Sequence, residues 1–310
     1  MKTRCVLSTD SINGMDGALS LAESGFTLIE LLIVVVILAT LASLLLPALG
    51  KARARGQGVK CLQNLRQMGI AWMLYADDNF EVLPPNMNAL NRDETKTWVR
   101  GWLNTANTPD NTNILYLQTS SLAPYLGNAL DVWKCPSDKS TSLHGGVRYP
   151  RVRSISMNGY FNNENYPWAK SANKMMLKYS DITEPGPSGT WAFIDERADS
   201  INNGNFCTQS SRFNPINPAD MWLINYPANY HAGAGNLSFA DGHAESHRWV
   251  DPRTTPPPNT LNNHILNGIY NPKNQDLYWL LPRTAGRSGF PGEERVPDPW
   301  DLDVGDNPGP

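Results

Sequence analysis

One apolar segment constrains this chain more than any other feature. From Phe26 to Leu46, the only charged residue is Glu30. As an α-helix, this segment would be about 31 Å long, which matches the hydrocarbon core of a bilayer. The alternative is a helix buried in a globular domain, but such helices rarely stay apolar on every face over this length. We therefore expect one membrane span at 26–47, and no later segment resembles it.

An ordinary cleaved secretory signal fits this segment less well. Such a signal has a short apolar stretch of about 7–15 residues, followed by a cleavage site with small residues. Here the preceding residues 1–25 are mostly polar, and the apolar stretch is longer. It also runs on through Pro47 into a segment rich in Lys and Arg.

Glu30 is the exception within the apolar segment. A carboxylate inside a membrane costs about 2.5 kcal/mol or more unless it finds a partner. Because Glu30 lies one turn inside the span, its side chain could reach the interface. Alternatively, it could meet a cation that another subunit supplies.

The sequence SGFTLIE at residues 24–30, followed by an apolar helix, resembles the leader of type IV pilins and type II secretion pseudopilins. The resemblance implies that a prepilin peptidase cleaves after Gly25 and methylates the new amine of Phe26. It also implies that Glu30 pairs with the N-terminal ammonium of a neighbouring subunit during assembly. Pro47 matches a proline that kinks the helix in this family.

The resemblance also implies a topology. It places a single-pass protein in the inner (cytoplasmic) membrane, with the C-terminal domain in the periplasm or cell envelope. The basic residues Lys51, Arg53 and Arg55 follow the span, and the positive-inside rule alone would place the domain in the cytoplasm. This chain also has Glu23 and Ser24 where the family usually has Lys or Arg before the glycine. We follow the resemblance.

Residues 48–80 should continue the helix in amphipathic form, because apolar residues recur at steps of three and four. The expected buried stripe is Val59, Leu62, Leu65, Gly69, Met73 and Ala76. A sheet packed on this stripe would explain it.

Three segments have the β-branched and aromatic content of strands between turn residues: 151–159, 189–196 and 235–251. We therefore expect an α+β, pilin-like fold, in which the long N-terminal helix packs on an antiparallel β-sheet domain with long loops.

The last of these segments should form a hairpin with a two-residue turn at Asp241–Gly242. In that register Leu237 would face Ser246, and Leu237 and Phe239 would point into the core. His243, Glu245 and His247 would then line the opposite face.

A second resemblance covers the folded part of the chain. The stretch CLQNLRQMGIAWMLYADDN at 61–79, WKCPSD at 133–138, and His231 followed nine residues later by Asp241-Gly242 resemble pseudopilin-related proteins with a prepilin-type processing-associated H-X9-DG domain. Because Cys61 and Cys135 lie in these motifs, the resemblance favours a disulfide between them. Burial of Cys61, Cys135 and Cys207 as thiols is the alternative.

Two roles are open for His231 and Asp241. The imidazole could hydrogen-bond the hairpin turn and fix its position, which is the interpretation we favour. A metal site is the alternative, with ligands drawn from His231, Asp241, His243, Glu245 and His247. We expect no cofactor otherwise, apart from Ca²⁺ or another divalent metal at a carboxylate-bearing loop such as that of Asp138.

Composition and motifs exclude other classes. With 26 Lys+Arg against 29 Asp+Glu and a net charge of -3, the chain does not fit a protein that binds nucleic acid by neutralising phosphates. It has no Gly-x-Ser-x-Gly, Walker or His-Glu-x-x-His motif, so we expect no enzyme. The adjacent acids Asp195 and Glu196 should lie at the surface or at a helix end.

The resulting hypothesis has five segments: a cytoplasmic leader at 1–25 that is removed, the span at 26–47, the helix at 48–80, a β-rich domain at 81–281 and a flexible tail at 282–310. The function is that of a pilin- or pseudopilin-like subunit, with prepilin peptidase, sister subunits and membrane lipid as partners. One alternative is an anchored envelope protein that binds a polysaccharide through some of its ten Trp. A metal-dependent enzyme at the His243 face is a third, weaker one.

Overall fold

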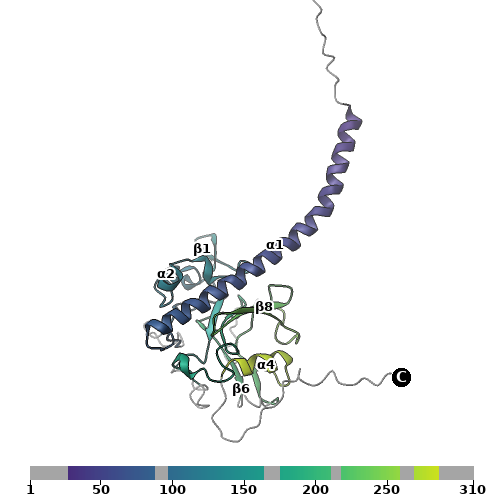
Figure 1. Ribbon diagram of the computed structural model, residues 1–310. Helices are drawn as coiled ribbons and strands as arrows, with labels where there is room; N and C mark the ends of the chain where they lie inside the picture. Colours follow the sequence, from purple (N-terminus) through teal and green to yellow (C-terminus); the bar gives the residue numbers. More distant parts are fainter. Residues whose placement is uncertain (1–26, 88–96, 164–174, 211–217, 259–268, 286–310) are drawn as a thin grey trace, which may run out of the picture. The chain divides into compact units, whose positions relative to one another are not determined.

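The computed structural model describes residues 27–87, 97–163, 175–210, 218–258 and 269–285. By its contacts the chain divides into two compact units, Met1–Gly50 and Lys51–Pro310. The dominant element is helix α1, Leu28–Asp78, which contributes to both units (Figure 1). It confirms the expected long N-terminal helix, and it ends at Asp78, two residues before the expected end at residue 80.

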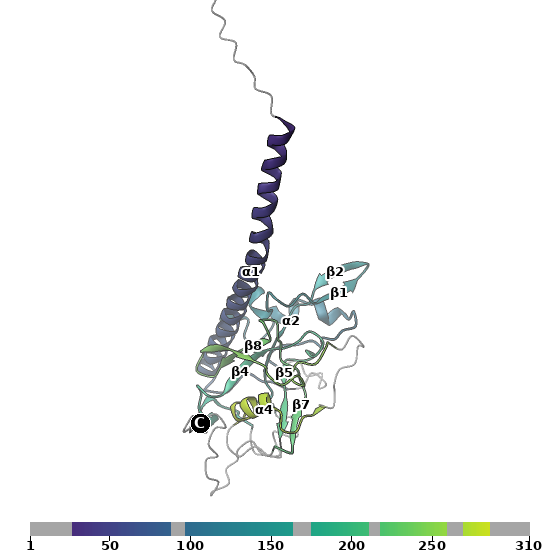
Figure 2. The same cartoon turned by 90° about the vertical axis from the view of Figure 1, so that its right-hand side faces the viewer.

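The core of the second unit is a five-stranded sheet with the order β5-β3-β4-β8-β9 (Figure 2). Its strands are β3 Ile155–Asn158, β4 Trp191–Asp195, β5 Asn205–Phe206, β8 Ala234–Phe239 and β9 Ala244–Arg248. Three of the four pairings are antiparallel, but β3 and β5 run parallel. The fold is therefore α+β with a mixed central sheet, rather than a purely antiparallel one.

Two smaller sheets and several short helices complete the unit. The strands are β1 Thr141–His144 and β2 Val147–Pro150, which pair, and β6 Thr208–Ser210, β7 Met221–Leu223 and β10 Ile269–Tyr270, which form a three-stranded sheet. The helices are α2 Leu115–Gln118, α4 Gln275–Leu280, η2 Pro109–Thr112, η3 Pro124–Leu126, η4 Asp131–Trp133, η5 Tyr179–Asp181 and η6 Leu281–Arg283.

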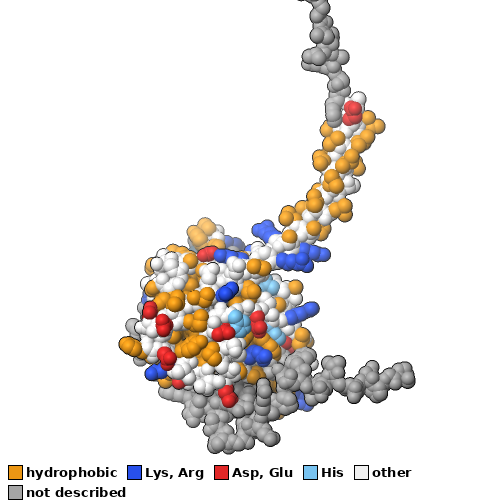
Figure 3. Space-filling model, in the orientation of Figure 1, with side chains coloured by type: hydrophobic (Ala, Val, Ile, Leu, Met, Phe, Trp, Pro, Cys, Tyr) orange, Lys and Arg blue, Asp and Glu red, His pale blue; other side chains and the backbone are white. Residues whose placement is uncertain are grey.

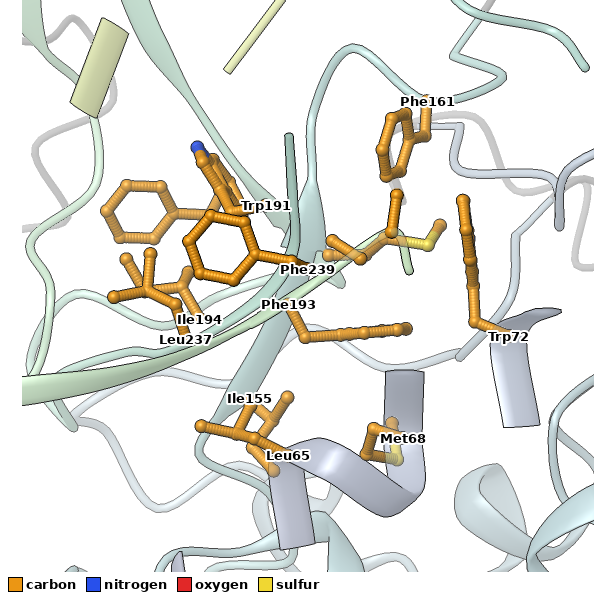
Figure 4. Close-up of a cluster of buried hydrophobic side chains, with 14 of the residues drawn as sticks. Leu65, Met68, Trp72, Ile155, Phe161, Trp191, Phe193, Ile194, Leu237 and Phe239 are labelled. Atoms are coloured by element: carbon orange, nitrogen blue, oxygen red, sulfur yellow. The ribbon is translucent and has the colours of Figure 1, made fainter. Parts of the chain in front are cut away.

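Helix α1 packs on one face of the central sheet through its second half. The buried face consists of Cys61, Asn64, Leu65, Met68, Gly69, Ala71, Trp72 and Ala76. This face is rotated from the expected stripe, because Val59 is 57% exposed while Met68 and Trp72 are fully buried. The aromatic core explains the rotation: Trp72 stacks on Phe161 at 5.0 Å between ring centroids (Figure 4).

Both faces of the central sheet are covered. Gly69 of α1 lies against β8, where an added Cβ would come within 3.3 Å of Ser238. On the other face, the ring of His247 stacks on Trp279 of α4, at 3.6 Å. Along β8, every residue is consequently buried, and the residues that face α1 alternate with those that face α4.

The β8–β9 hairpin is real, but its register differs from the prediction by one residue. Leu237 faces Glu245 rather than Ser246. The amide of Gly242 donates to the carbonyl of Phe239. Within the loop 240–242, Gly242 alone has a positive φ, at 86°. This is a three-residue loop closed by a left-handed glycine, whereas the predicted type I′ turn also requires a positive φ at Asp241.

The corrected register changes which side chains share a face. His243 stacks on the ring of Phe239, with centroids 4.3 Å apart. His243, Glu245 and His247 therefore lie on the same face as Leu237 and Phe239, and the expected opposite face was wrong.

The first residues of the expected tail, 282–285, belong to the folded domain. Leu281–Arg283 forms η6, and Thr284 and Ala285 are buried. The hydroxyl of Thr284 accepts from the indole of Trp191 at 3.0 Å, which ties this segment to the core. Residues 286–310 lie outside the described part of the chain.

Replacing Trp72 with Ala should destabilise the second unit by about 3–5 kcal/mol, because it removes a fully buried indole and leaves a cavity. Leu74, two residues away on α1 and 47% exposed, supplies the control: Leu74→Ala should change stability by less than about 1 kcal/mol. Urea denaturation of Lys51–Pro310 measures both. Equal losses would contradict the packing of α1 described above.

His247 should make the second unit sensitive to acid. Burial lowers the pKa of His247 from 6.5 to about 4, so the unfolded chain takes up a proton that the folded chain resists. The contribution of His247 to stability should be complete above about pH 6.5 and should fall by about 1–2 kcal/mol toward pH 4, after allowance for partial exposure.

The test compares urea denaturation across this pH range for the wild type and for His247→Phe, which keeps an aromatic ring against Trp279. The variant should lose less stability in acid. His243→Gln is the control and should retain the wild-type loss. An unchanged acid loss in His247→Phe would contradict this account of His247.

Candidate functional site

The first candidate site is the N-terminal turn of α1. The hydroxyl of Thr27 donates to Glu30 Oε2 at 2.7 Å, the amide of Thr27 donates to the same oxygen at 2.9 Å, and the amide of Glu30 donates to the Thr27 hydroxyl oxygen at 3.3 Å. This reciprocal arrangement is a capping box, which satisfies amides at the helix start. Gly25 and Phe26, the expected cleavage and methylation residues, lie outside the described part of the chain.

The rest of the first unit is a helix with an apolar surface. Hydrophobic side chains cover the visible face of this half of α1 (Figure 3). None of its most apolar window is buried, and α1 is the one helix among the described residues that is long and apolar enough to cross a membrane. Pro47 lies inside α1 without ending it. A surface of this kind requires lipid or other apolar helices around it.

The H-X9-DG motif lies against the second half of α1. At its first residue, the ring of His231 is close enough to α1 that a Cβ on Gly58 would lie 3.3 Å from Nδ1. At its end, a Cβ on Gly242 would meet the Met73 side chain. The motif residues thus lie at the two ends of β8, where both approach the helix.

His231 does not fix the hairpin turn, so the favoured structural role was wrong in detail. Its Nε2 lies 3.4 Å from Cys135 Sγ. Asp241 instead accepts from the amide of His243, two residues later, and His243 Nδ1 lies 2.6 Å from Asp241 Oδ1. His231 and Asp241 therefore have separate partners.

Cys61 and Cys135 lie close together, as the favoured disulfide requires, but they do not form a disulfide in the structure. The structure has both, together with Cys207, as buried thiols. The sulfurs of Cys61 and Cys135 lie within 4.8 Å of each other, in a group that also includes Asp195 and His231. A hydrogen bond with Cys61 and another with His231 lower the pKa of Cys135 to about 5.

The adjacent acids Asp195 and Glu196 are fully buried, contrary to the expectation of a surface position. Glu196 accepts hydrogen bonds from Ser156, Ser200 and Asn225, and burial raises its pKa to about 7. Asp195 was not predicted as a site residue. The sequence feature that could have identified Asp195 is its position directly after the apolar run WAFI, at the end of a strand covered on both faces.

The other proposed metal ligands do not form such a group. Among the described residues, the set whose ligand atoms converge is Cys61, Cys135, Asp195 and His231. His243 is paired with Asp241, and His247 is stacked on Trp279. Asp138 accepts from Ser140 and lies 3.5 Å from the ammonium of Lys134.

Comparison with known proteins identifies the N-terminal segment only. Residues 21–46 match the family described as the prokaryotic N-terminal methylation motif. No curated protein and no solved structure matches the chain. The matched segment contains Gly25, Phe26 and Glu30, and it supports a pilin-like, prepilin-type protein anchored in a membrane by one helix.

Proposed function

We propose that this chain is a structural subunit of a type IV pilus-like or type II secretion assembly. Prepilin peptidase cleaves after Gly25 and methylates Phe26, and the subunits then associate through the first half of α1. The domain that follows lies in the periplasm or cell envelope. The observation that carries the proposal is an exposed, mostly apolar helix segment at 28–46 whose only charge, Glu30, lies in its first turn within a methylation motif.

The charge of Glu30 favours association between subunits. Cleavage after Gly25 creates an ammonium at Phe26, four residues before Glu30. Each charge is costly in a low-dielectric medium, and pairing them between neighbouring subunits compensates both. The capping box already directs the carboxylate toward the start of α1, where such an amine would approach.

The polysaccharide-binding alternative loses support from the indole rings. Trp72, Trp98, Trp133 and Trp191 are fully buried. Trp98 stacks on Trp133, with centroids 5.5 Å apart, in the interior of the domain. These side chains fill the core and cannot serve as an exposed stacking surface for sugars.

Replacing Glu30 tests the proposal. In the native host, Glu30→Ala and Glu30→Gln should reduce the cross-linked or sedimentable assembled fraction about tenfold or more, since breaking a buried charge pair costs about 3 kcal/mol or more. Membrane levels should remain those of the wild type. Thr40→Ala removes another polar side chain from the same exposed helix and should assemble normally.

Two results would oppose the proposal. Wild-type assembly by both Glu30 variants would remove the charge pair from the mechanism. A wild-type chain that remains monomeric in the native membrane would favour a simple anchored protein.

A further inference from the structure

Four side chains from distant parts of the sequence converge beneath α1. Cys61 comes from α1, Cys135 follows η4, Asp195 ends β4, and His231 precedes β8. Their sulfur, carboxylate and imidazole ligand atoms all lie within 4.8 Å of one another. Cys61, Cys135 and Asp195 are fully buried. All four belong to the second unit.

The spacing fits a tetrahedral metal centre. The Sγ atom of Cys61 lies 3.4 Å from Asp195 Oδ2, and the Sγ atom of Cys135 lies 3.4 Å from His231 Nε2. With metal–ligand bonds of about 2.0–2.3 Å, the ligand atoms of a tetrahedron lie about 3.3–3.8 Å apart. These two edges fall in this range, and the remaining ligand atoms lie within 4.8 Å of one another.

The charge of the cluster favours a cation. Asp195 is fully buried, and no Lys or Arg in the described part of the chain forms an ion pair with it. Its side-chain partners there are the thiol of Cys61 and the hydroxyl of Ser154. A buried carboxylate without a counter-charge is expensive. A divalent cation would supply that charge and would also stabilise the two thiolates.

The surroundings hold the ligands in place. The hydroxyl of Ser154 donates to Asp195 Oδ1 at 2.9 Å, and the amide of Cys135 donates to the Ser154 hydroxyl oxygen at 2.8 Å. Gly58, without a side chain, leaves room for the His231 ring. Such supporting contacts orient the ligands of metal centres. Cys135 also lines an open hollow of about 610 Å³.

We propose that Cys61, Cys135, Asp195 and His231 bind one Zn²⁺ ion in a structural site. Two thiolates, one imidazole and one carboxylate suit zinc, whereas Ca²⁺ and Mg²⁺ prefer oxygen ligands only. The ligands bind the ion as thiolates, a neutral imidazole and a carboxylate, so binding releases any proton that these sulfur and carboxyl groups still hold. The ion joins α1 to β4, to the loop after η4 and to the start of β8, and it gives His231 of the H-X9-DG motif a role that Asp241 does not share. This site does not depend on the proposed assembly.

The test uses the full-length chain in detergent, reduced and stripped of metal with a chelator. Titration with Zn²⁺ against a chromophoric chelator should show one ion per chain. Titration with Co²⁺ should give the thiolate charge-transfer and tetrahedral absorption bands of a cobalt site with cysteine ligands. Cys61→Ser and Cys135→Ser should weaken Zn²⁺ binding about a hundredfold or more, in line with loss of a ligand.

Cys207→Ser is the matched control, because Cys207 is also a buried cysteine but lies outside the cluster. It should bind Zn²⁺ and Co²⁺ as the wild type does. His243→Gln is the corresponding histidine control for His231→Gln, which should lose affinity.

A second measurement on the wild type covers the case in which the serine variants fail to fold. Peptide mapping after alkylation should show that Zn²⁺ protects Cys61 and Cys135 together. The proposal is overturned if the reduced wild type binds no stoichiometric Zn²⁺, if Cys207→Ser loses binding as the cluster variants do, or if Cys61 and Cys135 form a disulfide in the chain from its native host.

Discussion

The bare apolar surface of the first half of α1 is the constraint on which this account depends. A helix with no buried residue in its most apolar window is not stable in water as an isolated element, so lipid or other apolar helices must cover it. Glu30 restricts which partner fits, because a single carboxylate at the helix start favours a partner with a positive charge at the same depth in the membrane. The methylation motif at 21–46 explains how such a partner would arise.

The second half of the same helix meets a different requirement. Here α1 buries Leu65, Met68 and Trp72 against a sheet that α4 covers on its other face. The ligand atoms of Cys61, Cys135, Asp195 and His231 converge at this interface. A metal ion at that point would fasten the helix to three separate segments of the domain, where apolar packing alone leaves Asp195 without a counter-charge.

Much of the fold could be predicted from sequence periodicity. The long helix, β4 and the β8–β9 hairpin followed from apolar spacing and turn residues. The hairpin register did not, because Asp-Gly suits two loop lengths that differ in the φ of Asp241. The buried face of α1 also differs from the predicted stripe, because Trp72 stacks on the ring of Phe161, which is distant in sequence.

The converging cluster was less accessible from the sequence. Cys61, Cys135 and His231 were singled out through family motifs, but Asp195 was assigned to the surface because adjacent acids are usually solvated. Only the sheet topology places the carboxyl end of β4 beneath Cys61. The presence of Asp195 in the cluster therefore depends on strand pairings that no local sequence pattern determines.

The mature N-terminus of the chain tests the central claim most directly. Mass spectrometry of protein purified from the native host should find a chain that begins at Phe26 and carries one methyl group on its amine. An intact segment upstream of Phe26 would contradict the account, because without that amine Glu30 has no counter-charge to meet on a neighbouring subunit.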